Sequence, residues 1–334
     1  MENTLAPQDA APMSDTAALC VDSRASRDFG GRGWVASDLI EGLGHHVFAE
    51  DGPLVLAHPQ QDLDVPFRRT NTRTPVGGGW FSPGWEKKFV ATRQIAWFHR
   101  FLPIDRVHSS GKCSQITTLL PPLKKTPFFL SRKNGHHFVV PSAADAEWLQ
   151  KNYGIPEHQV TVIRPSCRRA VLESGVFIPN AERGVVVVRD GRKDGFERHV
   201  SVIRRNFPHT RLVTVDLRDA QATAPEAWLR TLRNAQICFY LVDRPFDWAT
   251  LALEAAYRNI PLVFADTNRT LREAIASPSL RLHSFMAEPP ILSQLENAME
   301  PVRGELDARG YFNPNQQAIA YRELYMDLGA LGLG

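Results

Sequence analysis

Two cationic side chains follow a short apolar run in the second half of the sequence. The run GVVVVRD, residues 184–190, is rich in valine, ends beside Arg189, and is followed closely by Lys193. If this run is a buried parallel strand, both side chains lie at its carboxyl end, which is where open α/β sheets bind ligands. Guanidinium and ammonium groups at that edge suit the phosphates of a nucleotide. An ordinary solvated turn at 189–193 is the alternative.

A second candidate site is the start of a helix that the segment DWATLALEAAYRN, residues 247–259, predicts to begin near Asp247. The free N–H groups of its first turn, together with Thr250, would face a diphosphate. Glu254 lies about two turns into that helix, and its carboxylate, which only accepts hydrogen bonds, would suit a ribose diol. Asp243 precedes the helix as a further candidate donor-binding residue. Asp247 is a candidate catalytic carboxylate, although an aspartate at a helix start is more often an N-cap.

The first half offers a glycine-rich loop and one histidine. Gly31, Arg32 and Gly33 stand between a predicted strand and a predicted helix, where glycine lets the backbone approach a ligand closely. A plain tight turn explains the same residues without a ligand. His108 ends the run IDRVHSS and is a candidate catalytic group on the acceptor side, with a structural role as the alternative. The four cysteines are scattered and no Cys/His spacing suits zinc, so we expect no metal site.

The elements that must position these residues are clearest after residue 166. Short runs that are apolar throughout indicate strands buried on both faces, and strands that alternate with helices of about ten residues indicate a parallel sheet. The predicted strands are 184–190, 211–216, 237–243, 261–266 and 280–285, and the predicted helices between and after them are 196–207, 225–235, 250–259, 270–277 and 291–302. We expect one doubly wound, Rossmann-like domain here.

The first half shows a weaker form of the same rhythm. Strands are predicted at 18–24, 46–52, 63–69, 104–110, 126–132, 136–142 and 159–165, with helices at 30–45, 86–101 and 145–154. A last helix at 315–329 follows a segment rich in Pro, Gly and Asn. The predicted fold class is therefore α/β, with two Rossmann-like domains facing across a cleft and a carboxy-terminal docking helix. The predicted division is a tail at 1–17, domains at 18–165 and 166–312, and a helix at 313–334 that packs back toward the first domain.

Composition restricts the function classes. The chain has 334 residues, of which 43% are hydrophobic and 22% charged, as in ordinary globular proteins, which excludes a collagen, a coiled coil or a largely disordered chain. A net charge of +3 is too small for a dedicated nucleic-acid binder, so we expect no nucleic-acid partner. The first 17 residues have no basic start or apolar centre, and no run approaches the length of a membrane-spanning helix. We therefore expect a cytoplasmic protein with reduced cysteines.

One stretch suggests contact with a membrane surface. From 67 to 106 there are eight Lys and Arg residues against two acids, with eight Phe and Trp residues interleaved. Basic and aromatic side chains on a helix and its preceding loop suit the edge of an anionic membrane, which would place the protein peripherally at the inner membrane face. A helix whose aromatic residues pack into the core of the first domain is the alternative.

Three segments, in this order, resemble the retaining glycosyltransferases of family 4. The opening VDSRASRDFGGRGWVASDLIEGLG at 21–44 is similar to that family's first strand, glycine-rich loop and first helix. The run VVPSAADAEWLQKNYGIPEHQVTVIRPS at 139–166 resembles its crossing between domains. The run from 229 to 266 resembles its conserved block, with Glu254 at the second glutamate and Pro261 at the proline. The resemblance implies the two-domain architecture called GT-B.

The resemblance also implies an activity: transfer of a sugar from a nucleotide-diphosphate-sugar to an acceptor, with retention and without a metal or a further cofactor. The acceptor would be a cell-envelope glycan or a lipid-linked glycan. Arg189 and Lys193 would hold the phosphates, Glu254 the ribose, and Gly31 to Gly33 would shape the phosphate side. The family's first glutamate is Phe246 here, which leaves open a catalytically silent binding or scaffold subunit. An epimerase on the same fold is a third alternative.

Overall fold

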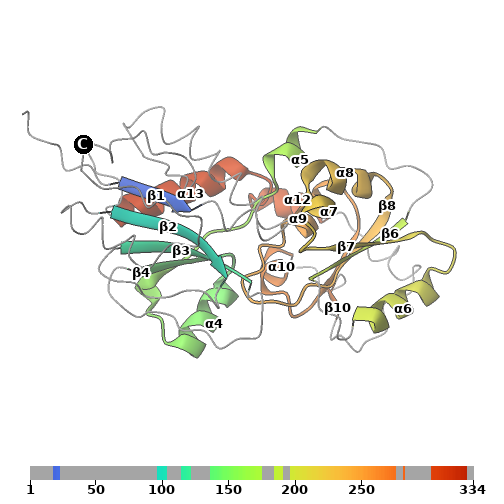
Figure 1. Cartoon of the computed structure of the whole chain (residues 1–334), viewed down its shortest axis with the longest axis horizontal. Coiled ribbons are helices and arrows are strands. Elements are labelled where there is room, and N and C mark those ends of the chain that lie inside the picture. The colour runs from blue at the N-terminus through green and yellow to red at the C-terminus, as the bar shows by residue number, and fades with distance from the viewer. Residues whose placement is uncertain are drawn as a thin grey trace, which may run out of the picture.

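The computed structural model describes eight segments of the chain, and all structural statements below concern these residues. They are 18–22, 96–103, 114–121, 136–174, 184–190, 196–275, 281–282 and 302–328. They form two parallel sheets with their helices, one from each half of the sequence (Figure 1).

The first sheet contains five parallel strands in the order β1-β2-β3-β4-β5. Their bounds are β1 Ala18–Asp22, β2 Ala96–Pro103, β3 Ser114–Leu120, β4 His136–Val140 and β5 Val160–Val162. Helix α4, Ala143–Tyr153, connects β4 toward β5 and is followed by the short 3-10 turn η3, Glu157–Gln159. The helix begins because Ser142 accepts a hydrogen bond from the Asp145 amide, and it ends at Gly154 in the left-handed conformation.

The predicted helix at 86–101 is wrong for residues 96–101, which form most of β2. This strand lies between β1 and β3 and pairs with both. Its aromatic residues favour a pleated surface, and two partner strands satisfy its backbone. The basic and aromatic stretch is therefore not a membrane-facing helix over 96–101, and the rest of 67–106 lies outside the described residues, apart from 102–103 at the end of β2.

The second sheet also contains five parallel strands, in the order β10-β9-β8-β6-β7. Their bounds are β6 Gly184–Arg189, β7 Leu212–Asp216, β8 Ala235–Tyr240, β9 Leu262–Ala265 and β10 Arg281–Leu282. The helices are α5 Arg169–Glu173, α6 Phe196–Asn206, α7 Ala220–Thr223, α8 Pro225–Arg233, α9 Thr250–Tyr257 and α10 Arg269–Ala274. The first strand, β6, lies between the second and the third, so the direction of winding reverses between β6 and β8. This reversal is the topological switch point of a doubly wound sheet.

The core explains why the β6 run is apolar at every position. Val186 and Val188 belong to one buried cluster, and Val185 and Val187 belong to a second on the opposite face of the sheet. Trp228 and Leu232 of α8 pack in the first cluster, while Val200 and Ile203 of α6 pack in the second. A strand covered by helices on both faces has no polar side, as the sequence predicts.

Two segments cross between the sheets side by side. The outgoing segment follows β5, and the returning one joins α12, Arg303–Ala308, to α13, Pro314–Asp327. Cys167 donates its amide to the carbonyl of Tyr311 at 3.2 Å, and Arg169 Nη2 bonds Asn315 Oδ1 at 2.9 Å. Helix α13 then lies along the first sheet (Figure 1), where Tyr321 Oη and Thr118 Oγ1 of β3 are 2.9 Å apart.

The α/β class with two parallel sheets is confirmed. Described strands fall within or overlap the predicted ones at 18–24, 136–142 and 159–165 and at all five sites after residue 166, and α4, α6, α8, α9, α10 and α13 overlap the predicted helices. Predictions at 30–45, 46–52, 63–69, 104–110 and 126–132, and nearly all of 291–302, lie outside the described residues. No described helix is long and apolar enough to cross a membrane.

Candidate functional site

The candidate site lies at the switch point of the second sheet, at the carboxyl ends of β6 and β8. Arg189 ends β6, and its Nε lies 3.4 Å from Asp216 Oδ2 at the end of β7, with both side chains part-exposed. Arg244, after β8, forms a buried ion pair with the carboxylate of Asp190 and donates to its carbonyl at 3.1 Å. Asp243 beside it is exposed. Charged groups from neighbouring strands thus meet where this topology binds ligands.

The loop from 243 to 249, which joins β8 to α9, has an unusual backbone. Phe246 and Ala249 have φ values of 58° and 49°, in the left-handed region that residues with a Cβ rarely adopt. Both side chains are buried. Strain of this kind persists only where surrounding contacts fix the backbone, and it is concentrated at ligand-binding positions.

Helix α9 begins at Thr250, where the helical pattern at 250–259 begins, and not near Asp247, and Asp247 is not its N-cap. The N-cap is Ala249, which supplies no side-chain hydrogen bond. The buried carboxylate of Asp247 instead accepts from Tyr240 Oη at 3.2 and 3.0 Å and from Asn268 Nδ2 at 2.7 Å. It therefore links β8 to the start of α10, and its catalytic role remains a prediction.

The amino-terminal end of α9 offers hydrogen-bond donors. Leu253 N–H bonds the carbonyl of Ala249, so the amides before it in the first turn have no partner within the helix. Thr250 is 6% exposed, and among the described residues its buried hydroxyl has no hydrogen-bond partner. A buried hydroxyl without a partner costs free energy that a bound oxygen atom would recover.

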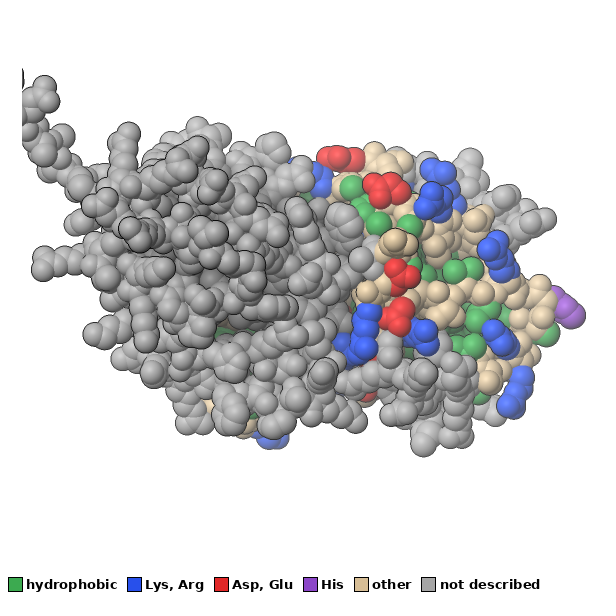
Figure 2. Space-filling model, viewed as in Figure 1, with side chains coloured by type: hydrophobic (Ala, Val, Ile, Leu, Met, Phe, Trp, Pro, Cys, Tyr) green, Lys and Arg blue, Asp and Glu red, His purple; other side chains and the backbone are tan. Residues whose placement is uncertain are grey.

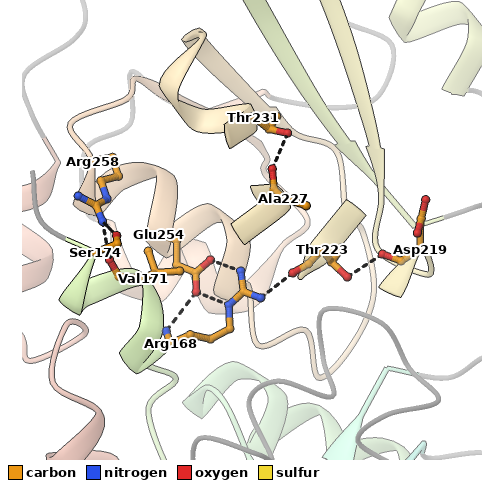
Figure 3. Close-up of polar contacts among 9 residues, drawn as sticks. All are labelled: Arg168, Val171, Ser174, Asp219, Thr223, Ala227, Thr231, Glu254 and Arg258. Atoms are coloured by element: carbon orange, nitrogen blue, oxygen red, sulfur yellow. Dashed lines mark hydrogen bonds and ion pairs between the residues drawn. The ribbon is translucent and has the colours of Figure 1, made fainter. Parts of the chain in front are cut away.

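The structure places Glu254 in an internal ion pair (Figure 3). Its side chain is fully buried, and Arg168 donates to both of its oxygens, from Nε at 2.6 Å to Oε1 and from Nη2 at 2.6 Å to Oε2. The Arg168 amide also donates to Oε1 at 3.1 Å, and Nη1 bonds the carbonyl of Thr223 at 2.6 Å. Both oxygens of the Glu254 carboxylate thus accept hydrogen bonds from Arg168, which lies on the outgoing segment between the sheets. The ribose contact by Glu254 stays a prediction.

Four buried charged residues of this region were not predicted as site residues from the sequence: Asp145, Arg168, Asp190 and Arg244. Asp145 and Arg168 have partners 86 or more positions away along the chain, which no local pattern shows. Only Asp145 had a local signal, because Ser142 and Asp145 have the spacing of a helix capping box. Burial raises the pKa of the Asp145 carboxyl, although hydrogen bonds from Arg269 and Ser142 oppose that rise.

The other predicted site residues, Gly31, Arg32, Gly33, His108 and Lys193, lie outside the described residues. Within the described part of the chain there is no cluster of three or more His, Cys, Asp or Glu residues able to hold a metal ion. Acidic and basic side chains both occur on the face of the second half shown in Figure 2, so no single sign of charge covers it.

Comparison with known proteins identifies the architecture. No protein-family model and no curated sequence matches the chain. Among solved structures, AviGT4, a glycosyltransferase involved in avilamycin A biosynthesis, is 13% identical with a TM-score of 0.51, covering 93% of this chain and 98% of that one. A glycosyltransferase from Rickettsia africae ESF-5 is 10% identical (TM-score 0.48; 94% and 98% covered), and WaaG, a glycosyltransferase involved in lipopolysaccharide biosynthesis, is 12% identical (TM-score 0.46; 95% and 100% covered). The fold assignment rests on AviGT4: the chain has the GT-B architecture of glycosyltransferases.

Proposed function

We propose that the protein is a glycosyltransferase that moves a sugar from a nucleotide-diphosphate-sugar to an acceptor. The proposal is supported by the GT-B fold together with the switch-point site, where a guanidinium group, a helix start and a buried hydroxyl with no hydrogen-bond partner among the described residues occur in one region. Sugar transfer from such a donor requires stabilisation of the negative charge that develops on the diphosphate leaving group.

In this proposal the diphosphate binds at the start of α9. Thr250 Oγ1 and the first-turn amides donate hydrogen bonds to phosphate oxygens, and the positive end of the helix dipole favours their charge. Arg189 adds positive charge at the end of β6, Lys193 follows it in the sequence, and Asp243 is an exposed acid of the 243–249 loop that precedes α9. Because these groups supply the positive charge, the proposed transfer is independent of a metal.

The finer parts of the proposal come from the sequence resemblance. They are retention of the anomeric configuration, a cell-envelope glycan or lipid-linked acceptor held by the first domain, His108 on the acceptor side, and the glycine loop at 31–33 beside the phosphates. Contact with a membrane through the described part of 67–106 would involve β2, an inner strand of the first sheet.

The proposal is tested by calorimetric titration with UDP, GDP, ADP and CMP and by replacement of Thr250 with valine, which has the same shape but no hydroxyl. We expect one of the four nucleotides to bind, and T250V to weaken that affinity about tenfold, the equivalent of one charge-assisted hydrogen bond. Stability should not fall, because the variant removes a buried hydroxyl that has no partner among the described residues.

Thr231→Val is the matched control. Thr231 is a part-buried threonine of α8 whose hydroxyl bonds the carbonyl of Ala227 at 3.1 Å, so this variant loses a hydrogen bond without touching α9. Its nucleotide affinity should equal that of the wild type. Equal nucleotide affinities for T250V and wild type would mean that the phosphates do not bind at the start of α9.

A catalytically silent binding or scaffold subunit is the second candidate. The observation that favours it is the Arg168–Glu254 pair, because a carboxylate whose two oxygens are already bonded inside the protein is not available to a ribose. Incubation of the purified protein with a panel of nucleotide-sugars separates the two. Donor hydrolysis or transfer supports the enzyme, whereas nucleotide binding without turnover, or no binding, supports the silent subunit. An epimerase would convert the donor sugar without an acceptor.

A further inference from the structure

Four side chains join the first half of the molecule to the loop that precedes α9. They are Asp145 and Trp148 of α4, Phe246 of the loop and Arg269 of α10, and we call them the interdomain clasp. Asp145 Oδ1 accepts a hydrogen bond from the Phe246 amide at 3.2 Å and from Arg269 Nη1 at 2.9 Å. These hydrogen bonds join the two halves of the chain. Asp145 lies on α4, which connects strands of the first sheet, whereas Phe246 lies on the loop after β8 of the second sheet.

The ring of Trp148 completes the clasp. Residues 145 and 148 are three positions apart on α4 and therefore share a face of that helix. The Trp148 ring contacts the ring of Phe246 edge-on, with centroids 5.6 Å apart, and the guanidinium of Arg269 lies 5.1 Å from its centroid. One face of α4 thus holds both the backbone and the side chain of Phe246.

The carboxylate at the centre of the clasp is itself fixed. Asp145 is 1% exposed, its Oδ2 accepts from Ser142 Oγ at 2.9 Å, and its own amide donates to the same hydroxyl at 3.1 Å. These bonds orient Oδ1 toward the Phe246 amide. Burial of a carboxylate is costly, and such a group is retained where its hydrogen bonds specify one arrangement.

The contact falls on a residue with a strained backbone. Phe246 has a φ of 58°, a left-handed conformation that costs free energy in a residue with a side chain and persists only where the surroundings fix it. Farther along the loop, Trp248 Nε1 donates to the carbonyl of Leu119 in β3 at 3.1 Å. The first half of the protein therefore holds the loop at two points just before Thr250.

We infer that Asp145 is a positioning residue for the nucleotide site: it holds Phe246 in the left-handed conformation and thereby sets where α9 begins and where Thr250 and the first-turn amides are presented. The inference rests on the proposed function for its ligand. It implies that Asp145 of α4, without contacting the donor phosphates itself, influences the affinity for them.

The experiment compares Asp145→Ala and Asp145→Asn with the wild type in the full-length protein. Hydrogen exchange of a peptide spanning 243–252 reports the loop, and calorimetry with the nucleotide that binds the wild type reports the site. D145A removes the acceptor for the Phe246 amide, so exchange in this peptide should rise about tenfold and nucleotide affinity should fall about tenfold. D145N keeps an oxygen acceptor and should restore most of the protection from exchange and most of the nucleotide affinity. If only the negative charge of Asp145 mattered, D145N would restore neither.

Glu273→Ala is the matched control. Glu273 of α10 accepts a hydrogen bond from the Ala143 amide at 2.7 Å, so it joins the same two helices without touching the loop. E273A should leave exchange at 243–252 and nucleotide affinity as in the wild type. If E273A and D145A have the same effects, or if D145A folds and exchanges at 243–252 like the wild type, Asp145 is not a positioning residue.

The two proposals fail in distinguishable ways. If no nucleotide binds the wild type, the proposed function is wrong, and hydrogen exchange still decides whether Asp145 holds the loop. If D145A does not fold, Trp148→Leu replaces it, because that variant removes the ring contact with Phe246 and keeps the carboxylate. W148L should raise exchange at 243–252, and unchanged exchange would overturn the clasp.

Discussion

At the scale of single residues, the molecule uses buried charge to connect distant parts of the chain. Arg168 with Glu254, Arg244 with Asp190 and Arg269 with Asp145 each join different elements of the structure. An ion pair of this kind seldom adds much net stability over an apolar replacement, but removal of one partner leaves a buried charge without compensation. These pairs therefore specify one arrangement of the elements more than they strengthen it.

Replacement of Glu254 by glutamine tests this account of the buried pair. We expect a loss of about 3–5 kcal/mol in the free energy of unfolding, because the guanidinium of Arg168 remains buried beside an uncharged amide. The double variant Arg168→Met/Glu254→Leu should recover much of that loss, since neither charge remains. Urea unfolding of both variants, together with the single variants Arg168→Met and Glu254→Leu, completes a double-mutant cycle.

The control for this cycle is Arg272→Met. Arg272 pairs with Asp266 at 3.7 Å, and its side chain is half-exposed, so its loss should cost less than about 0.5 kcal/mol. A Glu254→Gln variant as stable as Arg272→Met would mean that Arg168 and Glu254 do not form a buried pair in solution.

At the scale of elements, the end of α9 shows how a local rule is kept by an unexpected residue. Asn259 follows the helix with a φ of 55°, its amide bonds the carbonyl of Ala256, and the amide of Ile260 bonds that of Ala255. This is a Schellman motif, in which glycine usually occupies the left-handed position. Asparagine is one of the few residues with a Cβ that adopts this conformation at a modest cost.

Replacement of Asn259 by glycine should therefore stabilise the protein by about 0.5–1 kcal/mol, and replacement by alanine should destabilise it by about 1 kcal/mol. Asn152, near the end of α4, is the control, because it lies inside a helix where glycine is unfavourable. Asn152→Gly should lower stability in the same thermal or urea experiment. Glycine effects of the same sign at 152 and 259 would contradict the left-handed backbone at 259.

Sequence patterns predicted the second sheet well and the first sheet less completely. Each strand of the second sheet is a continuous apolar run between helices, and burial on both faces leaves that signature in the sequence. The β2 segment failed because AWFHRFLP mixes basic and aromatic residues, and its strand conformation depends on pairing with β1 and β3, which a local window does not contain.

The candidate site divides in the same way. The carboxyl end of β6 and the helix carrying Thr250 and Glu254 were predicted because they follow from the strand and helix rhythm. The start of that helix was placed near Asp247, since an aspartate there resembles an N-cap, whereas two left-handed residues actually bring the chain into α9. The partner of Glu254 was not predictable, because Arg168 approaches it through the fold and not through the sequence.

At the scale of the whole molecule, α13 returns the carboxyl end of the chain to the first sheet. Tyr321 is buried, and its hydroxyl lies 2.9 Å from Thr118 Oγ1 in β3. Burial raises the pKa of this phenol, so it remains a neutral hydroxyl able to share a hydrogen bond with Thr118. The bond joins residues 203 positions apart.

Tyr321→Phe should lower the free energy of unfolding by about 1–2 kcal/mol, because it removes this hydrogen bond and leaves the buried Thr118 hydroxyl without it. Tyr257→Phe, which keeps the ring that contacts Phe312, is the control and should change stability by less than about 0.5 kcal/mol. Urea unfolding followed by circular dichroism measures both. Equal stabilities would mean that α13 does not dock through Tyr321.

The paired segments between the sheets restrict how the two halves of the molecule can move relative to each other. Arg164 and Cys167 on the outgoing segment donate hydrogen bonds to the carbonyls of Arg309 and Tyr311 on the returning one. These bonds join the two segments into a pair. Bending the halves toward each other would break those hydrogen bonds, whereas rotation about the long direction of the paired segments would preserve them. We therefore expect any large relative motion of the halves to be a rotation about the paired segments. Such a rotation alone would move α4 across the 243–249 loop that it contacts.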